Sequence, residues 1–316
     1  MQALLGAADE STKPSIEKLL EDYKTAVVDK RLSVIDILVS NPSLKTSLGA
    51  FINMLPAMRV RQYSISSSPL WNPSRCTLTV SVVSAPALSG TGDHFLGVAS
   101  NFLAELKPGD LVQVAVRPSA VAFALPADPS VPLVLFCAGS GLAPMRGFIQ
   151  ERATQIQSGR KDVGKVLLFY GCRNPEEDYM YSDAELKEWS QVGAVDVRPA
   201  FSRAKAQSEG CKYIQELVTS LPACSRRSLM CLYRRILHDG DDVNAFFRQG
   251  AKVGACCLSH FVLPLLINLL VLHLWREQCC SGDQGRLRQV DPEEHWEELR
   301  AGYEGVLEDP ERTLCY

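Results

Sequence analysis

The chain lacks a strong excess of charge of either sign, and it also lacks a basic leader, internal repeats and low-complexity linkers. Its 316 residues carry a formal net charge of -3, so nucleic acid is not an expected partner. Residues 1–15 contain no basic segment before their short apolar stretch, so no secretory signal is expected. A hydrophobic content of 46% and a charged content of 22% are ordinary for a globular protein, and the length suggests two domains.

The 11 cysteines lack the spacing of a disulfide scaffold, which indicates a reducing, cytoplasmic compartment. Seven of them follow residue 220, where the composition changes. A zinc site is the alternative, suggested by the following cysteines and histidines: Cys256, Cys257, His260, His273, Cys279 and Cys280. Adjacent cysteine doublets lack the two-residue separation of zinc ligands, so no metal site is predicted.

Apolar periodicity divides the first 130 residues into a helical and a strand-rich part. Residues 14–58 repeat apolar side chains at helical spacing. After Tyr63 the period changes, and apolar residues alternate with polar ones over 77–83 and over 112–116, as expected of half-buried strands. The pattern favours an antiparallel barrel or sandwich over this second part.

Beyond Pro132 the pattern is typical of a parallel α/β sheet. Continuous apolar runs of the buried-strand type alternate with amphipathic segments. Ser182 and Glu185 have the spacing of a capping box, which predicts the start of a helix. The expected elements are strands at 133–136, 165–170 and 194–202 and helices at 145–156 and 182–189.

The first candidate binding cluster combines a cation, an aromatic ring and a hydroxyl on one expected strand edge, at Arg61, Tyr63 and Ser64. Such a set can hold a pyrophosphate, stack on a flat heterocycle and hydrogen-bond its edge. The alternative is a surface strand that leads into a serine-rich turn at 66–68.

A second cluster of small residues, Gly97, Val98, Ala99 and Ser100, precedes an apolar helix. Small residues at a helix N-terminus let backbone N–H groups approach an anion, and the helix dipole favours that binding. The alternative is that Ser100 is an ordinary N-cap.

A glycine loop, Gly139-Ser140-Gly141 followed by Pro144, lies between a predicted buried strand and a helix. This placement suits the phosphates of a dinucleotide, although the loop is not the six-residue fingerprint of that class. Cationic, hydroxyl and aromatic residues that suit an adenosine 2′-phosphate come later, at Ser202, Arg203, Lys212, Tyr213 and Gln215. The alternative for this last group is a solvated basic loop.

The order and spacing of these segments are more specific than any one of them. RQYSISSSP, TLTVSVVSAP, GVASNFLAEL, KPGDLV, FCAGSGLAPMRGF, FYGCRNPEEDYMY, AFSRAK and KYIQ resemble NADPH–cytochrome P450 reductases over residues 14–215. The nearest resemblance is to the reductase part of self-sufficient fatty-acid hydroxylases, in which haem, FMN and FAD domains share one chain.

The resemblance implies an α+β and α/β fold of the ferredoxin–NADP reductase type. A helical connecting segment (1–58) and a partial antiparallel FAD-binding β-barrel (59–130) are expected to precede a parallel α/β NADPH-binding domain (131–253). The remaining residues, 254–316, are an aberrant tail.

The resemblance also implies residue roles and a reaction. Arg61 is expected to neutralise the FAD pyrophosphate, Tyr63 to pack on the isoalloxazine ring, and Ser64 to lie near the reactive flavin nitrogen. The pyrophosphate is expected at Gly97, Val98, Ala99 and Ser100. NADPH is expected at Gly139, Ser140, Gly141, Pro144, Cys172, Arg173, Ser202, Arg203, Lys212, Tyr213 and Gln215. The implied chemistry is hydride transfer from nicotinamide to FAD and then one-electron steps toward FMN and haem.

Several parts of the family pattern are missing. FMN and cytochrome P450 haem domains are expected as partners, in the same gene or on a separate chain. The early barrel strands of the family pattern are absent, and residues 217–234 match nothing in the family. After residue 253, sequence that resembles the family returns only near the end of the chain. Cys256 has the offset of the family's catalytic cysteine but lacks the Gly-acid pair that follows it.

These departures leave two alternatives open. The chain is an active reductase part, or it is an inactive truncated or mis-spliced product in which 217–234 and 254–290 are translated non-coding sequence. Residues 253–275 carry no charge and are long enough to span a bilayer, which offers a membrane-tethered alternative. Pro264 and Asn268 interrupt that stretch, so a membrane is not an expected partner.

Overall fold

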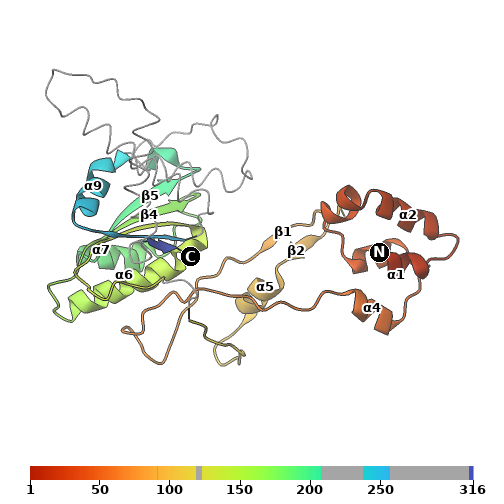
Figure 1. Cartoon of the computed structure of the whole chain (residues 1–316), viewed down its shortest axis with the longest axis horizontal. Helices are drawn as coiled ribbons and strands as arrows, with labels where there is room; N and C mark the ends of the chain where they lie inside the picture. The colour runs from red at the N-terminus through yellow and green to blue at the C-terminus, as the bar shows by residue number, and fades with distance from the viewer. Residues whose placement is uncertain (91, 119–122, 208–237, 257–312, 316) are drawn as a thin grey trace, which may run out of the picture. The chain divides into compact units, whose positions relative to one another are not determined.

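The computed structural model describes residues 1–90, 92–118, 123–207, 238–256 and 313–315 (Figure 1). Contacts divide the chain into two compact units. Unit 1 combines Met1–Gln62 with Ser81–Val112, and unit 2 combines Tyr63–Val80 with Gln113–Tyr316. Each unit is described separately.

The first part of unit 1 is helical, as the apolar spacing over 14–58 predicts (Figure 1). Leu4, Ile16, Ile37 and Leu44 form its small buried core. A capping box starts one of the helices, because Ser33 and Asp36 each accept a hydrogen bond from the backbone N–H of the other. The elements are α1 (Gln2–Gly6), α2 (Lys13–Glu21), the π-helix η1 (Tyr23–Val28), α3 (Val34–Ser40) and α4 (Leu48–Met54).

The strand-rich part contains less regular structure than the alternation predicts. Strands β1 (Ser84–Pro86) and β2 (His94–Leu96) pair antiparallel, and α5 (Val98–Glu105) follows them. The strand expected over 77–83 is reduced to one bridge between Leu78 and Ile65, and residues 112–116 form no strand in the described structure. A strand needs a hydrogen-bonding neighbour, and none of the described strands lies beside 112–116. The partial barrel therefore stays a prediction.

Unit 2 is built on a parallel sheet with the strand order β5-β4-β3-β6-β7. Every side chain from Val166 to Cys172 in β4 is buried, which explains the continuous apolar run of this central strand. The three strands predicted at 133–136, 165–170 and 194–202 are confirmed. The strands are β3 (Leu133–Ala138), β4 (Val166–Cys172), β5 (Val195–Phe201), β6 (Lys252–Cys256) and β7 (Thr313–Cys315).

Helices cover both faces of the sheet (Figure 1). Alternate residues of β3 point to opposite faces, so that Leu135 packs in the cluster that contains Met145 of α6 and Trp189 of α7. Phe136 instead packs with Phe169 and with Val243 of α9. The helical elements are α6 (Leu142–Gln157), η3 (Ser182–Leu186), α7 (Lys187–Gln191) and α9 (Gly240–Arg248), with short 3-10 turns at η2 (Gly139–Gly141) and η4 (Lys205–Gln207).

One sequence expectation in unit 2 is wrong. The capping box at Ser182 does not form, because the Glu185 carboxylate instead binds the guanidinium of Arg146 at 2.5 and 2.6 Å. Residues 254–256, the first of the expected tail, complete strand β6 beside β3, and the tail itself stays a prediction. The segments 217–234 and 257–290 lie outside the described residues.

Candidate functional site

The carboxyl ends of the parallel strands meet at one edge of the unit 2 sheet. From β3 the chain moves to β4 and β5 on one side, and it later returns as β6 on the other side of β3. Open α/β sheets bind ligands outside the strand ends at such a switch point. The loop Gly139–Gly141 follows β3 directly, so it lies at this position.

The glycine loop has the geometry that close approach of a ligand requires. Gly139 has a φ of +52°, a conformation that residues with a side chain rarely adopt, and a Cβ added there would meet no atom within 4 Å. Gly141 is the N-cap of the 16-residue helix α6, whose N-terminus carries partial positive charge. Pro144 lies in the first turn, where its missing N–H costs nothing. The open space and the helix end fit an anionic phosphate.

Two arginines lie at the ends of the neighbouring strands. Arg173 follows β4, and its backbone N–H and Nε both donate to the Asp178 carboxylate, at 2.8 and 3.0 Å. That hydrogen bond raises the pKa of Arg173. Arg203 follows β5, and its backbone N–H donates to the Arg173 carbonyl at 2.8 Å. The Arg203 guanidinium is half exposed and 3.7 Å from Glu177, so it remains accessible to a ligand.

Of the remaining predicted nucleotide-binding residues, the two that the structure describes, Ser202 and Cys172, are buried. Ser202 is buried, and its N–H donates to the Cys172 carbonyl at 2.9 Å, which extends the pairing of β4 and β5. Cys172 is also buried, and its burial raises the pKa of the thiol. The backbone of Cys256 in β6 lies opposite Cys137 of β3. The residues Lys212, Tyr213 and Gln215 lie outside the described part of the chain.

The segment after Tyr63 and Ser64 is not the surface turn that one alternative predicts. Ser66, Ser67 and Ser68 are all buried, with Ser66 completely inaccessible. The Ser68 N–H donates to Oε1 of Gln150 at 2.8 Å, and its Oγ donates to Oε2 of Glu151 at 3.0 Å. Within unit 2 these contacts hold the segment that follows Tyr63 and Ser64 against helix α6.

The other candidate flavin residues belong to unit 1. The exposed Arg61 donates through Nη1 to the carbonyl of Arg59. Gly97 is the N-cap of α5, so the alternative that assigned this position to Ser100 is wrong. The Ser100 Oγ instead accepts from the Val83 N–H at 3.0 Å and donates to the Gly97 carbonyl at 3.2 Å. A Cβ at position 97 would lie 2.7 Å from that Oγ and 2.8 Å from Cβ of Val83, so a larger residue would displace these neighbours.

Sequence reasoning missed Arg146 and Asp178. Arg146 lies in α6 with only 5% of its surface exposed and contacts both the serine segment and Glu185. A charged residue between the core positions Met145 and Ile149 of one helix is the signal that could have indicated a buried partner. Asp178 offered no comparable signal, because it lies in a polar loop.

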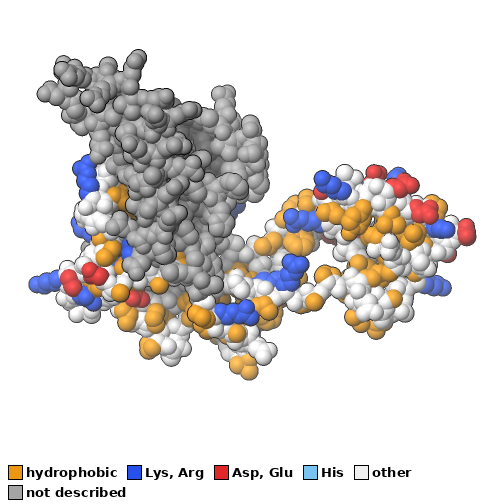
Figure 2. Space-filling model, in the orientation of Figure 1, with side chains coloured by type: hydrophobic (Ala, Val, Ile, Leu, Met, Phe, Trp, Pro, Cys, Tyr) orange, Lys and Arg blue, Asp and Glu red, His pale blue; other side chains and the backbone are white. Residues whose placement is uncertain are grey.

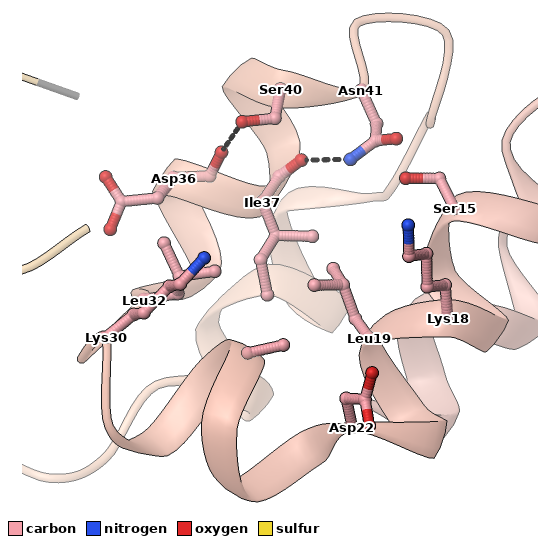
Figure 3. Close-up of a pocket in the computed structure, with 11 residues that line it drawn as sticks. Ser15, Lys18, Leu19, Asp22, Lys30, Leu32, Asp36, Ile37, Ser40 and Asn41 are labelled. Atoms are coloured by element: carbon pink, nitrogen blue, oxygen red, sulfur yellow. Dashed lines mark hydrogen bonds between the residues drawn. The ribbon is translucent and has the colours of Figure 1, made fainter. Parts of the chain in front are cut away.

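A hollow of about 330 Å³ lies among the helices of unit 1 (Figure 3). Its wall is fixed by local hydrogen bonds, since Asn41 Nδ2 donates to the Ile37 carbonyl and Ser40 Oγ to the Asp36 carbonyl, each at 2.8 Å. The charged groups around it are of both signs, with Lys18 and Lys30 beside Asp22 and Asp36. Because charges of both signs surround the hollow, it favours neither an anionic nor a cationic ligand, and no binding function is assigned to it.

Within the described residues, no cluster of histidine, cysteine and carboxylate side chains could hold a metal ion. No helix in that part of the chain combines the length and the apolarity needed to cross a membrane. Most of the stretch 253–275 and of the cysteine- and histidine-rich tail lies outside the described residues.

Thiol labelling tests the burial at the strand ends. Cys76 is exposed, whereas Cys137 and Cys172 are buried beneath α6. The thiolate is the reactive form, and burial raises the pKa of Cys172. We expect iodoacetamide to modify Cys76 roughly a hundredfold faster than either buried cysteine, as resolved by peptide mass spectrometry. Equal rates in the folded chain would contradict the packing of β3 and β4.

Comparisons with known proteins agree with this geometry. The FAD binding domain family matches residues 2–102, and the oxidoreductase NAD-binding domain family matches residues 135–226. A self-sufficient cytochrome P450 monooxygenase of Phanerodontia chrysosporium is 54% identical over 249 residues, which are 79% of this chain and 22% of that protein.

Two further relatives show the same partial coverage. A bifunctional cytochrome P450/NADPH–P450 reductase of Fusarium oxysporum is 47% identical over 250 residues, or 78% of this chain and 22% of the relative. Another from Acremonium egyptiacum is 47% identical over 208 residues, or 66% of this chain and 19% of the relative. The chain thus spans about a fifth of the length of these relatives. It belongs to the oxidoreductases that combine an FAD-binding with an NAD-binding domain, and its homologues are fusions of a cytochrome P450 with an NADPH–P450 reductase.

Proposed function

We propose that this chain accepts a hydride from NADPH onto FAD and passes the electrons toward an FMN domain and the haem of a cytochrome P450. The observation that carries the proposal is the glycine loop at the switch point of the parallel sheet, with Arg173 and Arg203 on the adjoining strand ends. A dinucleotide with a charged ribose phosphate matches both features.

The NADPH contacts follow from the strand ends. The pyrophosphate lies against Gly139, Ser140 and Gly141 at the N-terminus of α6, with Pro144 in the first turn. Arg203 binds the adenosine 2′-phosphate together with Ser202, Lys212, Tyr213 and Gln215. Cys172 and Arg173 lie toward the nicotinamide and ribose side. The half-exposed guanidinium of Arg203 and its long contact to Glu177 support its part in this assignment.

The FAD contacts are assigned to residues on either side of position 63. Arg61 neutralises the pyrophosphate together with the helix end at Gly97, Val98, Ala99 and Ser100, and the rigid packing at Gly97 supports a preformed anion site. Tyr63 packs on the isoalloxazine ring, and Ser64 hydrogen-bonds near its reactive nitrogen. The partial barrel over 59–130 is the fold that this assignment implies.

FAD and the protein have separate roles in the proposed reaction. FAD, when bound, supplies the ability to accept a hydride and to release single electrons. The protein orients the nicotinamide toward the flavin, and Cys256 is a candidate to line that position from the end of β6. Ser64 supplies a hydroxyl beside the reacting atoms, and buried strand ends exclude water from beneath them.

The partners follow from the architecture of the relatives. FMN and haem domains in the same gene are the proposed acceptors, and the cysteine pattern supports a cytoplasmic location. Exposed apolar side chains of unit 1 support contact with further domains, and Figure 2 shows several such patches. On α3 and α4 these include Ile35, Val39, Leu48 and Ile52.

A second candidate is a fragment that keeps the motifs but does not retain FAD. The observation in its favour is the exposure of the alternating segment 112–116, where Val114 is 77% and Val116 76% accessible. Apolar side chains so exposed lack the neighbours that a closed barrel provides.

Retention of FAD separates the two candidates. We expect the purified chain to keep near-stoichiometric FAD after removal of the excess, and Gly97→Ala to weaken that binding by at least about tenfold because its Cβ collides with Ser100 and Val83. Gly6→Ala is the control, since a Cβ there meets nothing within 4 Å. A colourless wild-type protein would rule out the reductase and support the second candidate, a fragment that does not retain FAD.

A further inference from the structure

The strongest buried contact outside the candidate site is made by a single arginine of α6. Arg146 is 5% exposed, and a buried guanidinium is stable only when its donors are paired. Its Nε and Nη2 donate to the two carboxylate oxygens of Glu185, at 2.6 and 2.5 Å. Its Nη1 donates to the carbonyl of Ser66 and, at 3.2 Å, to Oγ1 of Thr77.

One side of this network belongs to the nucleotide-binding sheet. Glu185 lies in η3, and the guanidinium carbon lies 4.7 Å from the ring centre of Tyr181 and 5.7 Å from that of Trp189. A two-point ion pair and two aromatic rings fix the plane of the guanidinium. A lysine offers no such planar pair of donors, so it cannot reproduce this geometry.

The other side belongs to the segment that follows Tyr63 and Ser64. Ser66 and Thr77 bind each other through backbone and hydroxyl groups, at 2.8 and 2.9 Å, and the Thr77 N–H donates to Ser67 Oγ at 2.9 Å. Thr79 then meets the Tyr181 hydroxyl at 2.9 Å, so the network returns to the first side. Loss of the arginine therefore removes the ion-paired contact between these two parts of unit 2 and leaves the Thr79–Tyr181 and Ser68 contacts in place.

Arg146 connects two segments that each carry candidate cofactor-binding residues. The residue lies five positions after Gly141, the N-cap of α6, and Ser66 lies two positions after Ser64. We propose that Arg146 is a positioning residue that sets the orientation of the flavin segment (63–68), through Ser66 and Thr77, relative to the helix that begins at the glycine loop. The inference rests on the proposed function, since only then do both parts carry reacting groups.

A second attachment makes the inference testable without unfolding the protein. Ser68 contacts Gln150 and Glu151 farther along the same helix, and these contacts do not involve Arg146. Arg146→Lys keeps the charge but loses the planar pair of donors. Thr77→Val removes the hydroxyl contacts of Thr77 to Arg146 and to Ser66 Oγ and keeps the ion pair with Glu185. Arg160→Lys is the matched control, because its partner Asp162 is exposed on the surface of the same unit.

Rapid-mixing kinetics of the FAD-loaded chain is the first test. We expect Arg146→Lys and Thr77→Val to slow flavin reduction by NADPH by about ten- to a hundredfold, because misplacement by about 1 Å costs that much. The Kd for NADP⁺ is expected to stay within about twofold of the wild-type value, as is the amount of FAD retained. Unchanged reduction rates, or rates lowered only in proportion to lost FAD or NADP⁺ binding, would overturn the positioning role.

Hydrogen exchange provides the second test and needs neither cofactor. We expect amide exchange over 63–80 to accelerate by about tenfold in both variants, with no change in Arg160→Lys. Unchanged exchange would overturn the inference. If the wild-type chain is not reduced by NADPH but this exchange difference appears, the proposed function fails while the link made by Arg146 stands.

Discussion

Replacing Arg203 by alanine is expected to raise the KM for NADPH by about ten- to a hundredfold while changing the KM for NADH by less than about twofold. The residue lies two positions after the end of β5, with its guanidinium half exposed at the carboxyl edge of the sheet. Among the described residues, it is our candidate for charge pairing with the 2′-phosphate, which NADH lacks. Steady-state oxidation of both cofactors with an artificial electron acceptor measures the two constants.

Glu177→Gln is the matched control for this prediction. Glu177 lies 3.7 Å from Arg203, so removing Arg203 also breaks a weak surface ion pair. If the effect came from that ion pair, Glu177→Gln would reproduce it, whereas we expect Glu177→Gln to leave the KM for NADPH within about twofold. Equal losses for NADPH and NADH in Arg203→Ala would contradict the assignment of the 2′-phosphate to this residue.

Gly164→Ala is expected to destabilise unit 2 by about 3 kcal/mol, at the upper end of the cost of overpacking. An added Cβ would lie 2.3 Å from the carbonyl oxygen of Ser130 and 2.6 Å from the carbonyl carbon of Val131. Both are backbone atoms of the turn before β3, so they cannot move aside without displacing that strand. The Gly164 N–H also donates to the Pro129 carbonyl at 2.7 Å, which fixes the close approach.

Urea unfolding followed by circular dichroism measures the free energy of unfolding of this variant. Gly49→Ala is the control, because Gly49 lies in α4 with nothing within 4 Å of an added Cβ. We expect it to stabilise the protein by roughly 0.5–1 kcal/mol, since alanine favours the helix. Wild-type stability of Gly164→Ala would contradict the packing of the turn against the start of β4.

The parts of the fold that could be predicted are those whose signals are local. Strands β3 and β4 are buried on both faces, so each is a continuous apolar run, and the glycines of the following loop mark the start of α6. The position of that loop at a switch point was not predictable. It depends on β6 pairing with β3 across more than a hundred intervening residues.

The wrong expectations arose where a distant partner competes with a local signal. Glu185 has the spacing of a capping residue, but a buried arginine from another helix binds its carboxylate more strongly than a backbone N–H could. Helix α9 ends at Arg248, because Gly250 adopts a φ of +74° and Lys252 joins the sheet. Residues 112–116 alternate as a strand should, but alternation alone supplies no neighbouring strand.

Anaerobic mixing of the FAD-loaded chain with one equivalent of NADPH tests the central claim most directly. The measurement is the loss of the visible absorbance band of oxidised flavin. We predict that the band bleaches with NADPH, and much more slowly with the same concentration of NADH. Retained FAD that NADPH does not bleach would contradict the assignment of the glycine loop and the flavin segment to one hydride-transfer site.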